Sequence, residues 1–257
     1  MSQNSGKIAQ KENGGIVIIK LNIDGVDYAC TPSNGFLLVP SWITPTVVNL
    51  DALTGWSGEK DAGTKGTAVG TSAYPVNVGG RIARSFPSDY TNYGGMRYHC
   101  NYATDMNSHN FVYAGDLWFD DPAPLGQMEL DNNQVTADGR TYIFGCQANN
   151  NDGAWDVTEA ISASQWVITP AKGCPKTWPA KQWMHFEIAS HRDDAGNVTY
   201  DAVHFNGATQ AIGMTLPASL MLNWKRGDCV VNWQENGALP GAGSIRAYGS
   251  NTRVARW

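Results

Sequence analysis

Residues 126–145 read GQMELDNNQVTADGRTYIFG, and this stretch decides the class of fold. It opens with a predicted strand, residues 127–133, and continues through turn-forming residues into a second predicted strand. Glu129, Asp131 and Gln134 form the pattern ExDxxQ. Because successive side chains of a strand point to opposite faces, Glu129 and Asp131 share one face. The sequence therefore predicts a β-sheet protein that presents a pair of carboxyl groups on one face of a central strand.

The remainder of the chain shows the same pattern of strands and turns. Apolar residues alternate with a period of two, and no long window keeps the three-and-four spacing of an amphipathic helix. The one helix-like stretch, residues 156–164, is short. Further strands are predicted at residues 81–85, 96–102, 110–119, 141–147, 165–169, 183–190, 198–205, 208–213, 220–224, 228–234, 244–248 and 252–257. So many short strands predict an all-β fold, a two-sheet antiparallel jelly-roll β-sandwich.

The N-terminal region carries a separate hairpin signature. Residues 16–23 and 26–30 are strand-forming, and Asp24-Gly25 between them suits a type I′ turn. We therefore expect residues 1–45 to form an N-terminal β-hairpin segment or extension, and residues 46–257 to form the main domain.

Composition excludes several classes of protein. Apolar residues make up 42% of the chain, enough for a core, while the net charge is −5 and Lys and Arg are scattered. No basic patch suits nucleic acid. The apolar stretches fall far short of the ~20 residues that cross a bilayer, so no membrane partner is expected. The N-terminus lacks the features of a secretory signal. An extracellular or particle-surface location is nevertheless expected, with the cytoplasm as the alternative.

The five cysteines show no CxxC or other metal-type spacing: Cys30, Cys100, Cys146, Cys174 and Cys229. An extracellular domain favours a disulfide, and Cys146 with Cys174 is the expected pair because both flank the same tryptophan-rich segment. The alternative is a set of buried, reduced thiols.

Strand 183–190 has one apolar and one polar face. Trp183, His185 and Glu187 share a face, and the residues between them are apolar. This pattern indicates a strand with one face on the core and the other lining something polar.

Four segments resemble the concanavalin A-like lectin and glucanase superfamily. They are WFDDPAPLGQMELDNNQ at 118–134, TYIFGCQ at 141–147, the segment that carries Trp155, Trp166 and Cys174, and WMHFEIASHRDDAGNVTYDAVHFNG at 183–207. The chain is most similar to bacterial jelly-roll proteins with an EFDxNQ-type strand, over roughly residues 50–257. The resemblance implies two large antiparallel sheets, with a ligand groove across the concave face of one of them.

In retaining hydrolases of this superfamily the motif is ExDxxE. The resemblance places Glu129 at the nucleophile and Asp131 at its hydrogen-bonding partner. Gln134 stands at the acid/base position, or Asn133 does if the strand has no bulge. Either residue is an amide with no proton to give, so hydrolysis needs an acid from elsewhere. Candidates for that acid are Glu187, Asp116, Asp120 and Asp121, of which Asp120 and Asp121 also suit a turn.

Lectins of the same superfamily use a similar acidic pair to bind metal ions. Glu129 and Asp131 match the first two ligands, and Asp138 loosely matches a later one. Asn133 adds an oxygen suited to Ca²⁺. Tyr142 stands where a histidine ligand belongs, which disfavours a transition metal. We expect no cofactor, or Ca²⁺.

Ten tryptophans are more than one core accommodates, and sugar rings stack on indole faces. Trp118, Trp155 and Trp183 are the predicted stacking platforms, with Trp233 as a further candidate.

These features predict a noncatalytic protein that binds a polysaccharide or glycan through Glu129, Asp131, Gln134, His185 and Glu187. The first alternative is a polysaccharide hydrolase with Glu129 as nucleophile. The second is a structural or display component of a phage or extracellular assembly, which self-associates through residues 1–45.

Overall fold

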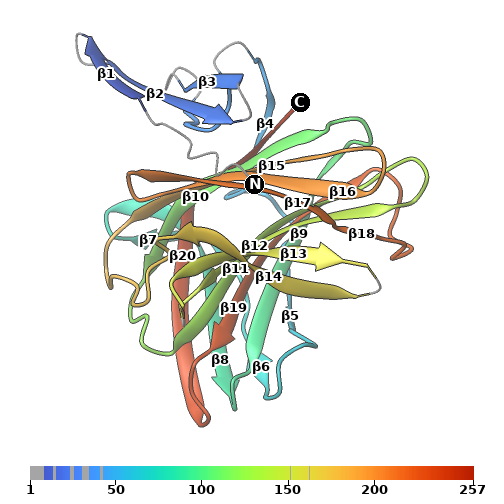
Figure 1. Ribbon diagram of the computed structural model, residues 1–257. Coiled ribbons are helices and arrows are strands. Elements are labelled where there is room, and N and C mark those ends of the chain that lie inside the picture. Colours follow the sequence, from blue (N-terminus) through green and yellow to red (C-terminus); the bar gives the residue numbers. More distant parts are fainter. Residues whose placement is uncertain are drawn as a thin grey trace.

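The structure is a computed structural model of the chain, and it describes residues 9–13, 16–23, 26–30, 35–40, 43–150, 152–161 and 163–257. Within these ranges all regular secondary structure is β, and two large antiparallel sheets pack face to face (Figure 1). The prediction of a two-sheet antiparallel β-sandwich is therefore confirmed. No helix in the described ranges is long and apolar enough to cross a membrane.

The first sheet has nine strands. Its order is β17 (Ala208–Pro217), β16 (Asn197–Phe205), β15 (Met184–Arg192), β10 (Asn110–Phe119), β20 (Ala242–Arg256), β8 (Arg81–Thr91) and β6 (Ala68–Val69). β4 (Thr46–Asn49) pairs with β20, and β7 (Ala73–Val78) pairs with β8.

The second sheet has eight strands. Its order is β14 (Ser164–Lys172), β13 (Ala154–Ala160), β12 (Thr141–Asn149), β11 (Leu125–Val135), β19 (Asp228–Gly237), β9 (Gly95–Thr104) and β5 (Ser57–Lys60). β18 (Ser219–Leu220) pairs with β12. β11 lies in the middle of this sheet, as the sequence predicts for the strand that carries the acidic pair.

The core lies between the two sheets and is rich in aromatic rings. Trp233 of β19 stacks on Phe86 of β8 with ring centroids 4.2 Å apart. Trp155 of β13 packs against Phe205 of β16. These four side chains alternate with outward-facing neighbours along their strands, as a sandwich requires.

The prediction of a helix-like stretch at residues 156–164 is wrong. These residues belong to the β13–β14 hairpin, in which Val157 pairs with Val167 and Thr158 pairs with Trp166. The period of two set by Trp155, Val157 and Glu159 carries this segment into the sheet, and burial against the core outweighs its weak helical spacing.

The N-terminal hairpin is confirmed for the described residues. β2 (Ile16–Ile23) pairs with β3 (Val26–Cys30) in the register Ile23 to Val26, and β1 (Ala9–Asn13) adds a third strand. The turn residues Asp24-Gly25 lie outside the described ranges.

Residues 35–40, which the sequence assigns to the N-terminal segment, pack on the outer face of the nine-stranded sheet. Phe36, Leu38 and Val39 are buried there against small side chains that include Val112 and Ala114. We call residues 35–40 the strap.

Candidate functional site

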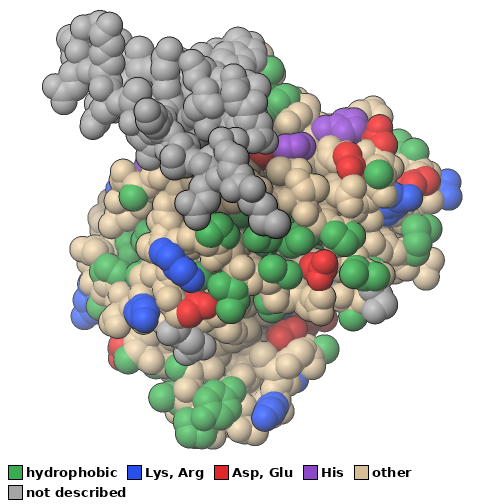
Figure 2. Space-filling model, viewed as in Figure 1, with side chains coloured by type: hydrophobic (Ala, Val, Ile, Leu, Met, Phe, Trp, Pro, Cys, Tyr) green, Lys and Arg blue, Asp and Glu red, His purple; other side chains and the backbone are tan. Residues whose placement is uncertain are grey.

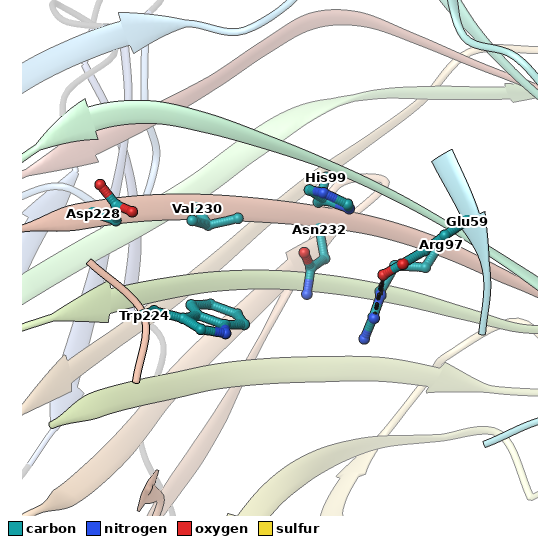
Figure 3. A pocket seen from close by; sticks show the side chains of 7 residues that line it. All are labelled: Glu59, Arg97, His99, Trp224, Asp228, Val230 and Asn232. Atoms are coloured by element: carbon teal, nitrogen blue, oxygen red, sulfur yellow. Dashed lines mark hydrogen bonds and ion pairs between the residues drawn. The ribbon is translucent and has the colours of Figure 1, made fainter. Parts of the chain in front are cut away.

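The outer face of the eight-stranded sheet carries a groove. Two adjoining hollows, of about 370 and 330 Å³, share Arg97, Trp224 and Asn232. Figure 3 shows the first hollow, with Asp228 at one end and the Arg97–Glu59 pair at the other. The second hollow is lined by Asp61, Gly63, Arg97, Glu129, Asp131, Asn133, Ile143, Thr158, Trp166, Leu222, Trp224, Asn232 and Gln234.

Strand register explains why these polar side chains meet. Glu129 of β11 pairs with Gln234 of β19, which in turn pairs with Arg97 of β9. Two residues further along β11, Asp131 pairs with Asn232. Side chains at alternate positions of neighbouring strands stand on one face, so each paired set forms a polar row across the sheet.

Gly145 allows Thr158 and Asp131 to lie close to the backbone of β12. It pairs with Asp131 across the β11–β12 ladder. A Cβ atom at Gly145 would lie 2.1 Å from Thr158 Oγ1 and 3.1 Å from Asp131 Oδ1. A side chain here is excluded by contact, so this close approach requires glycine.

The acidic pair is deeply buried for charged groups. Glu129 is 9% exposed and Asp131 is 4% exposed. Burial is the main reason that the pKa of Glu129 lies well above its usual value. The charge of Asp131 and the hydrogen bond with Asp131 raise this pKa further. Burial also raises the pKa of Asp131, against the hydrogen bonds from Glu129 and Asn232 that lower it. Two interacting carboxyl groups in such a setting share a proton, and we place that proton on Glu129.

Apart from the proton shared within the carboxyl pair, two acceptor oxygens in the groove receive no hydrogen bond of normal geometry from the described protein: Asp131 Oδ1 and Asn133 Oδ1. Asn133 is only 3% exposed. The other Asp131 oxygen accepts from Asn232 Nδ2 at 3.3 Å. Buried acceptors in native proteins are nearly always paired, so these two atoms are candidates for pairing with a ligand.

Aromatic rings stand at the rim. The side chains of Trp166 and Trp224 are 37% and 40% exposed and both line the second hollow. Neither ring is among the stacking platforms predicted from the sequence. Trp166 lies in a correctly predicted strand, and its alternation with Val167 is the signal that it faces away from the core.

The prediction that Gln134 shares the face of Glu129 is wrong. β11 runs without a register shift from Gln127 to Gln134 in both of its ladders, so no bulge turns Gln134 outward. Gln134 faces the interior, where its Oε1 accepts from Arg192 Nε at 2.7 Å. Asn133, the alternative for an unbulged strand, occupies the third position of the motif in the groove.

The prediction that His185 and Glu187 line the same groove is also wrong. Both lie on β15 of the nine-stranded sheet, on the outer face that the strap covers. Glu187 accepts from the backbone N–H groups of Leu37 and Leu38 at 2.8 Å, and His185 Nδ1 lies 2.8 Å from Asp116 Oδ1. Glu187 anchors the strap to the sheet, and His185 links Glu187 to Asp116.

The predicted stacking platforms lie elsewhere. Trp118 and Trp183 contact each other at the nine-stranded sheet, with ring centroids 5.4 Å apart. Trp155 and Trp233 are core residues, 1% and 0% exposed. Val157 and Val231 are also buried, and each lies two residues from one of these tryptophans on the same strand. The alternation of side chains along a strand therefore places both rings inward.

The remaining candidates also lie outside the groove. Asp120 accepts from Trp118 Nε1 at 3.0 Å, and Asp121 accepts from the Ala123 N–H at 2.9 Å, as in a turn. Asp138 lies in the β11–β12 turn, where it accepts from Thr136 Oγ1 at 2.6 Å.

No group of three or more His, Cys, Asp or Glu side chains in the described residues is arranged to hold a metal ion. Asp138 does not join Glu129 and Asp131 in the lining of the groove, so the three predicted ligands are not brought together. Binding of Ca²⁺ stays a prediction.

The predicted disulfide between Cys146 and Cys174 is wrong. Both are free, buried thiols. Burial raises the pKa of Cys174 to about 12, and it raises the pKa of Cys146 well above its usual value. Both side chains act as small core hydrophobes instead of a covalent link.

Positively charged side chains do not gather into one patch on the face of the molecule shown in Figure 2. Figure 2 shows Lys and Arg side chains dispersed over the visible face, with acidic side chains among them. In the groove, Arg97 donates to Glu59 in an ion pair, and this hydrogen bond lowers the pKa of Glu59.

No family model and no curated protein matches the chain. Solved structures with a similar arrangement of strands include alginate lyase vAL-1 from a Chlorella virus, with 13% identity and a TM-score of 0.44 over 75% of this chain and 93% of that one. A β-glucanase from Bacillus licheniformis has 12% identity and a TM-score of 0.39 over 82% and 97%. Arcelin-5, a lectin-like defence protein from Phaseolus vulgaris, has 8% identity and a TM-score of 0.42 over 79% and 98%.

Proposed function

We propose that the groove of the eight-stranded sheet binds a polysaccharide chain without cleaving it. The observation that carries this proposal is one hollow lined both by the buried acceptors Asp131 Oδ1 and Asn133 Oδ1, which lack a donor outside the carboxyl pair, and by the exposed rings of Trp166 and Trp224. Sugar hydroxyl groups donate hydrogen bonds to such acceptors, and the apolar faces of sugar rings pack on indole.

The third position of the motif supports binding over hydrolysis. Retaining hydrolysis requires a nucleophilic carboxylate and a second carboxyl group that gives and takes a proton across the glycosidic bond. Asn133 stands where that second group belongs, and an amide does not transfer a proton. Asp131 interacts directly with Glu129, so the two carboxyl groups act as one unit beside the ligand.

A glycan array with a reducing-end assay on every polymer that binds tests the proposal. Binding without new reducing ends is the expected result. Trp224→Ala should weaken binding about tenfold, or ~1.4 kcal/mol, by loss of ring stacking. Trp183→Ala is the matched control, because this indole lies at the other sheet beside Trp118. Equal weakening by both variants, or silence of the array, would overturn the proposal.

Calcium dependence is tested in the same assay by adding EDTA. We expect binding to be unchanged, because Asp138 lies in the β11–β12 turn and not beside Glu129 and Asp131 in the groove.

One observation favours hydrolysis as a second candidate function. Asp61 lines the same hollow as Glu129, and its charge contributes to raising the pKa of Glu129. Asp61 comes from the loop that follows β5, an element outside the ExDxxQ motif. If new reducing ends form, both Glu129→Gln and Asp61→Asn should abolish them. Activity that survives Asp61→Asn would exclude this pairing.

A further inference from the structure

The charges that line the groove are unevenly divided between the two signs. Among the described residues of the two hollows, Arg97 is the sole Lys or Arg side chain, and it is already paired with Glu59. The carboxyl groups along the same surface are Glu59, Asp61, Glu129, Asp131 and Asp228.

This distribution disfavours an anionic chain. A uronate or sulfate group in the groove would meet these carboxylates with no unpaired Lys or Arg side chain in the described lining, and the repulsion strengthens where protein walls lower the local dielectric. Lys65 lines a different hollow, of about 400 Å³, which adjoins the second hollow at Gly63. It therefore does not compensate the groove itself.

The distribution also disfavours a chain that is cationic at every sugar. The Arg97 guanidinium stands where the two hollows join, and Glu59 is committed to it. Of the carboxylates outside that ion pair, Asp61 and Asp131 line the second hollow and Asp228 lines the first. A repeated positive charge would meet the already paired Arg97 and Glu59 between them, where no free carboxylate receives it.

The first hollow follows β19 from Asp228 to Asn232, and the two hollows together extend across the strands of the sheet. The lining of the groove begins at Glu59 on β5, passes Asn232 on β19 and Asp131 on β11, and ends at Trp166 on β14. Trp224 borders both hollows, so one ligand that contacts it extends into either side.

We infer that the ligand of this groove is an uncharged, linear polysaccharide that crosses the strands and occupies both hollows. The inference rests on the proposed function, and it adds the chemical class and the extent of the ligand. Hydroxyl groups satisfy Asp131 Oδ1 and Asn133 Oδ1 without bringing a charge toward Asp61 or Asp228.

The test measures affinity for neutral, anionic and cationic polymers under the same conditions. The neutral probes are barley mixed-linkage β-glucan, xyloglucan and galactomannan; the charged probes are alginate, polygalacturonate and chitosan. The matched control is the best neutral binder after its primary hydroxyl groups are oxidised to carboxyl groups. We expect a neutral polymer to bind, its oxidised form to bind at least about tenfold more weakly, and added salt to leave the neutral affinity unchanged.

The outcomes separate this inference from the proposed function. Preferred binding of alginate, polygalacturonate or chitosan would overturn the inference and leave polysaccharide binding intact. Failure of every polymer to bind would overturn both.

Chain length gives a second, independent measurement. Affinity should rise from the disaccharide to the hexasaccharide of the bound polymer, because the longer chain reaches both hollows. Trp224→Ala should reduce this gain, while Trp183→Ala should not. An affinity that is constant from the disaccharide onward would overturn the assignment of both hollows to one ligand.

Discussion

Glu235 offers a quantitative test of the core, because it is a carboxyl group buried between the sheets. It follows the groove residue Gln234 on β19 and so faces inward beside Trp233. Its side chain is 0% exposed, Oε1 accepts from Trp233 Nε1 at 2.7 Å, and Oε2 receives no hydrogen bond. Burial raises the pKa of Glu235 to about 8, against the Trp233 hydrogen bond that lowers it.

The sign of the pH dependence follows from this direction. An unfolded glutamate ionises near its ordinary value of 4.5, whereas folded Glu235 keeps its proton until about pH 8. Its contribution to stability is therefore fully present below pH 4.5 and is lost as the pH rises through 8. At about 1.4 kcal/mol for each pKa unit between the two states, the loss approaches ~5 kcal/mol.

Glu235→Gln removes this ionisation and keeps an oxygen that accepts from Trp233. Urea unfolding across a pH series should show the wild-type protein losing about 5 kcal/mol relative to the variant as the pH rises from below 4.5 to above 8. Glu159→Gln is the control, since Glu159 accepts from Gln165 at an exposed position. Parallel stability curves for wild type and Glu235→Gln would refute the reasoning.

Three further changes test other contacts. Gly145→Ala forces a Cβ against Thr158 and should destabilise by about 1–3 kcal/mol in urea unfolding; an unchanged midpoint would contradict the packing. Glu187→Ala leaves the N–H groups of residues 37–38 without their acceptor and should lower the free energy of unfolding by about 1–3 kcal/mol. Hydrogen exchange in the strap should become faster, and unchanged exchange would show that the strap does not depend on Glu187. Deleting residues 252–257 removes the pairing of β20 with β4 and should abolish soluble protein, and a monodisperse product would argue against this role.

The strands and the face of the acidic pair follow from short-range information. Alternation along one strand determines which side chains share a face, so the common face of Glu129 and Asp131 needs no knowledge of the fold. The same rule assigns Asn133 to that face as soon as the strand is known to lack a bulge. A bulge depends on both neighbouring ladders, and for this reason the sequence left Asn133 and Gln134 as alternatives.

The assignment of strands to sheets depends on long-range pairing. The strand with His185 and Glu187 alternates between polar and apolar residues just as β11 does, so periodicity predicts an open polar face for each. β15 nevertheless pairs with β10, in the sheet opposite β11, and the strap covers its outer face. Glu129 meets Gln234 across more than a hundred residues of chain, and nothing local specifies that partner.

The two outer faces show what distinguishes a structural polar cluster from a binding surface. At the nine-stranded sheet, Glu187 is fully buried, but backbone N–H groups of the strap and His185 surround its oxygens. At the eight-stranded sheet, Asp131 and Asn133 are almost as buried, and each keeps an oxygen with no donor outside the carboxyl pair. Leaving an acceptor buried and unpaired costs about 1–3 kcal/mol, and a ligand that donates hydrogen bonds removes this cost on binding. Glu235 Oε2 is also unpaired, but it lies in the core, so the groove is marked by unpaired oxygens together with an open hollow and the exposed rings of Trp166 and Trp224.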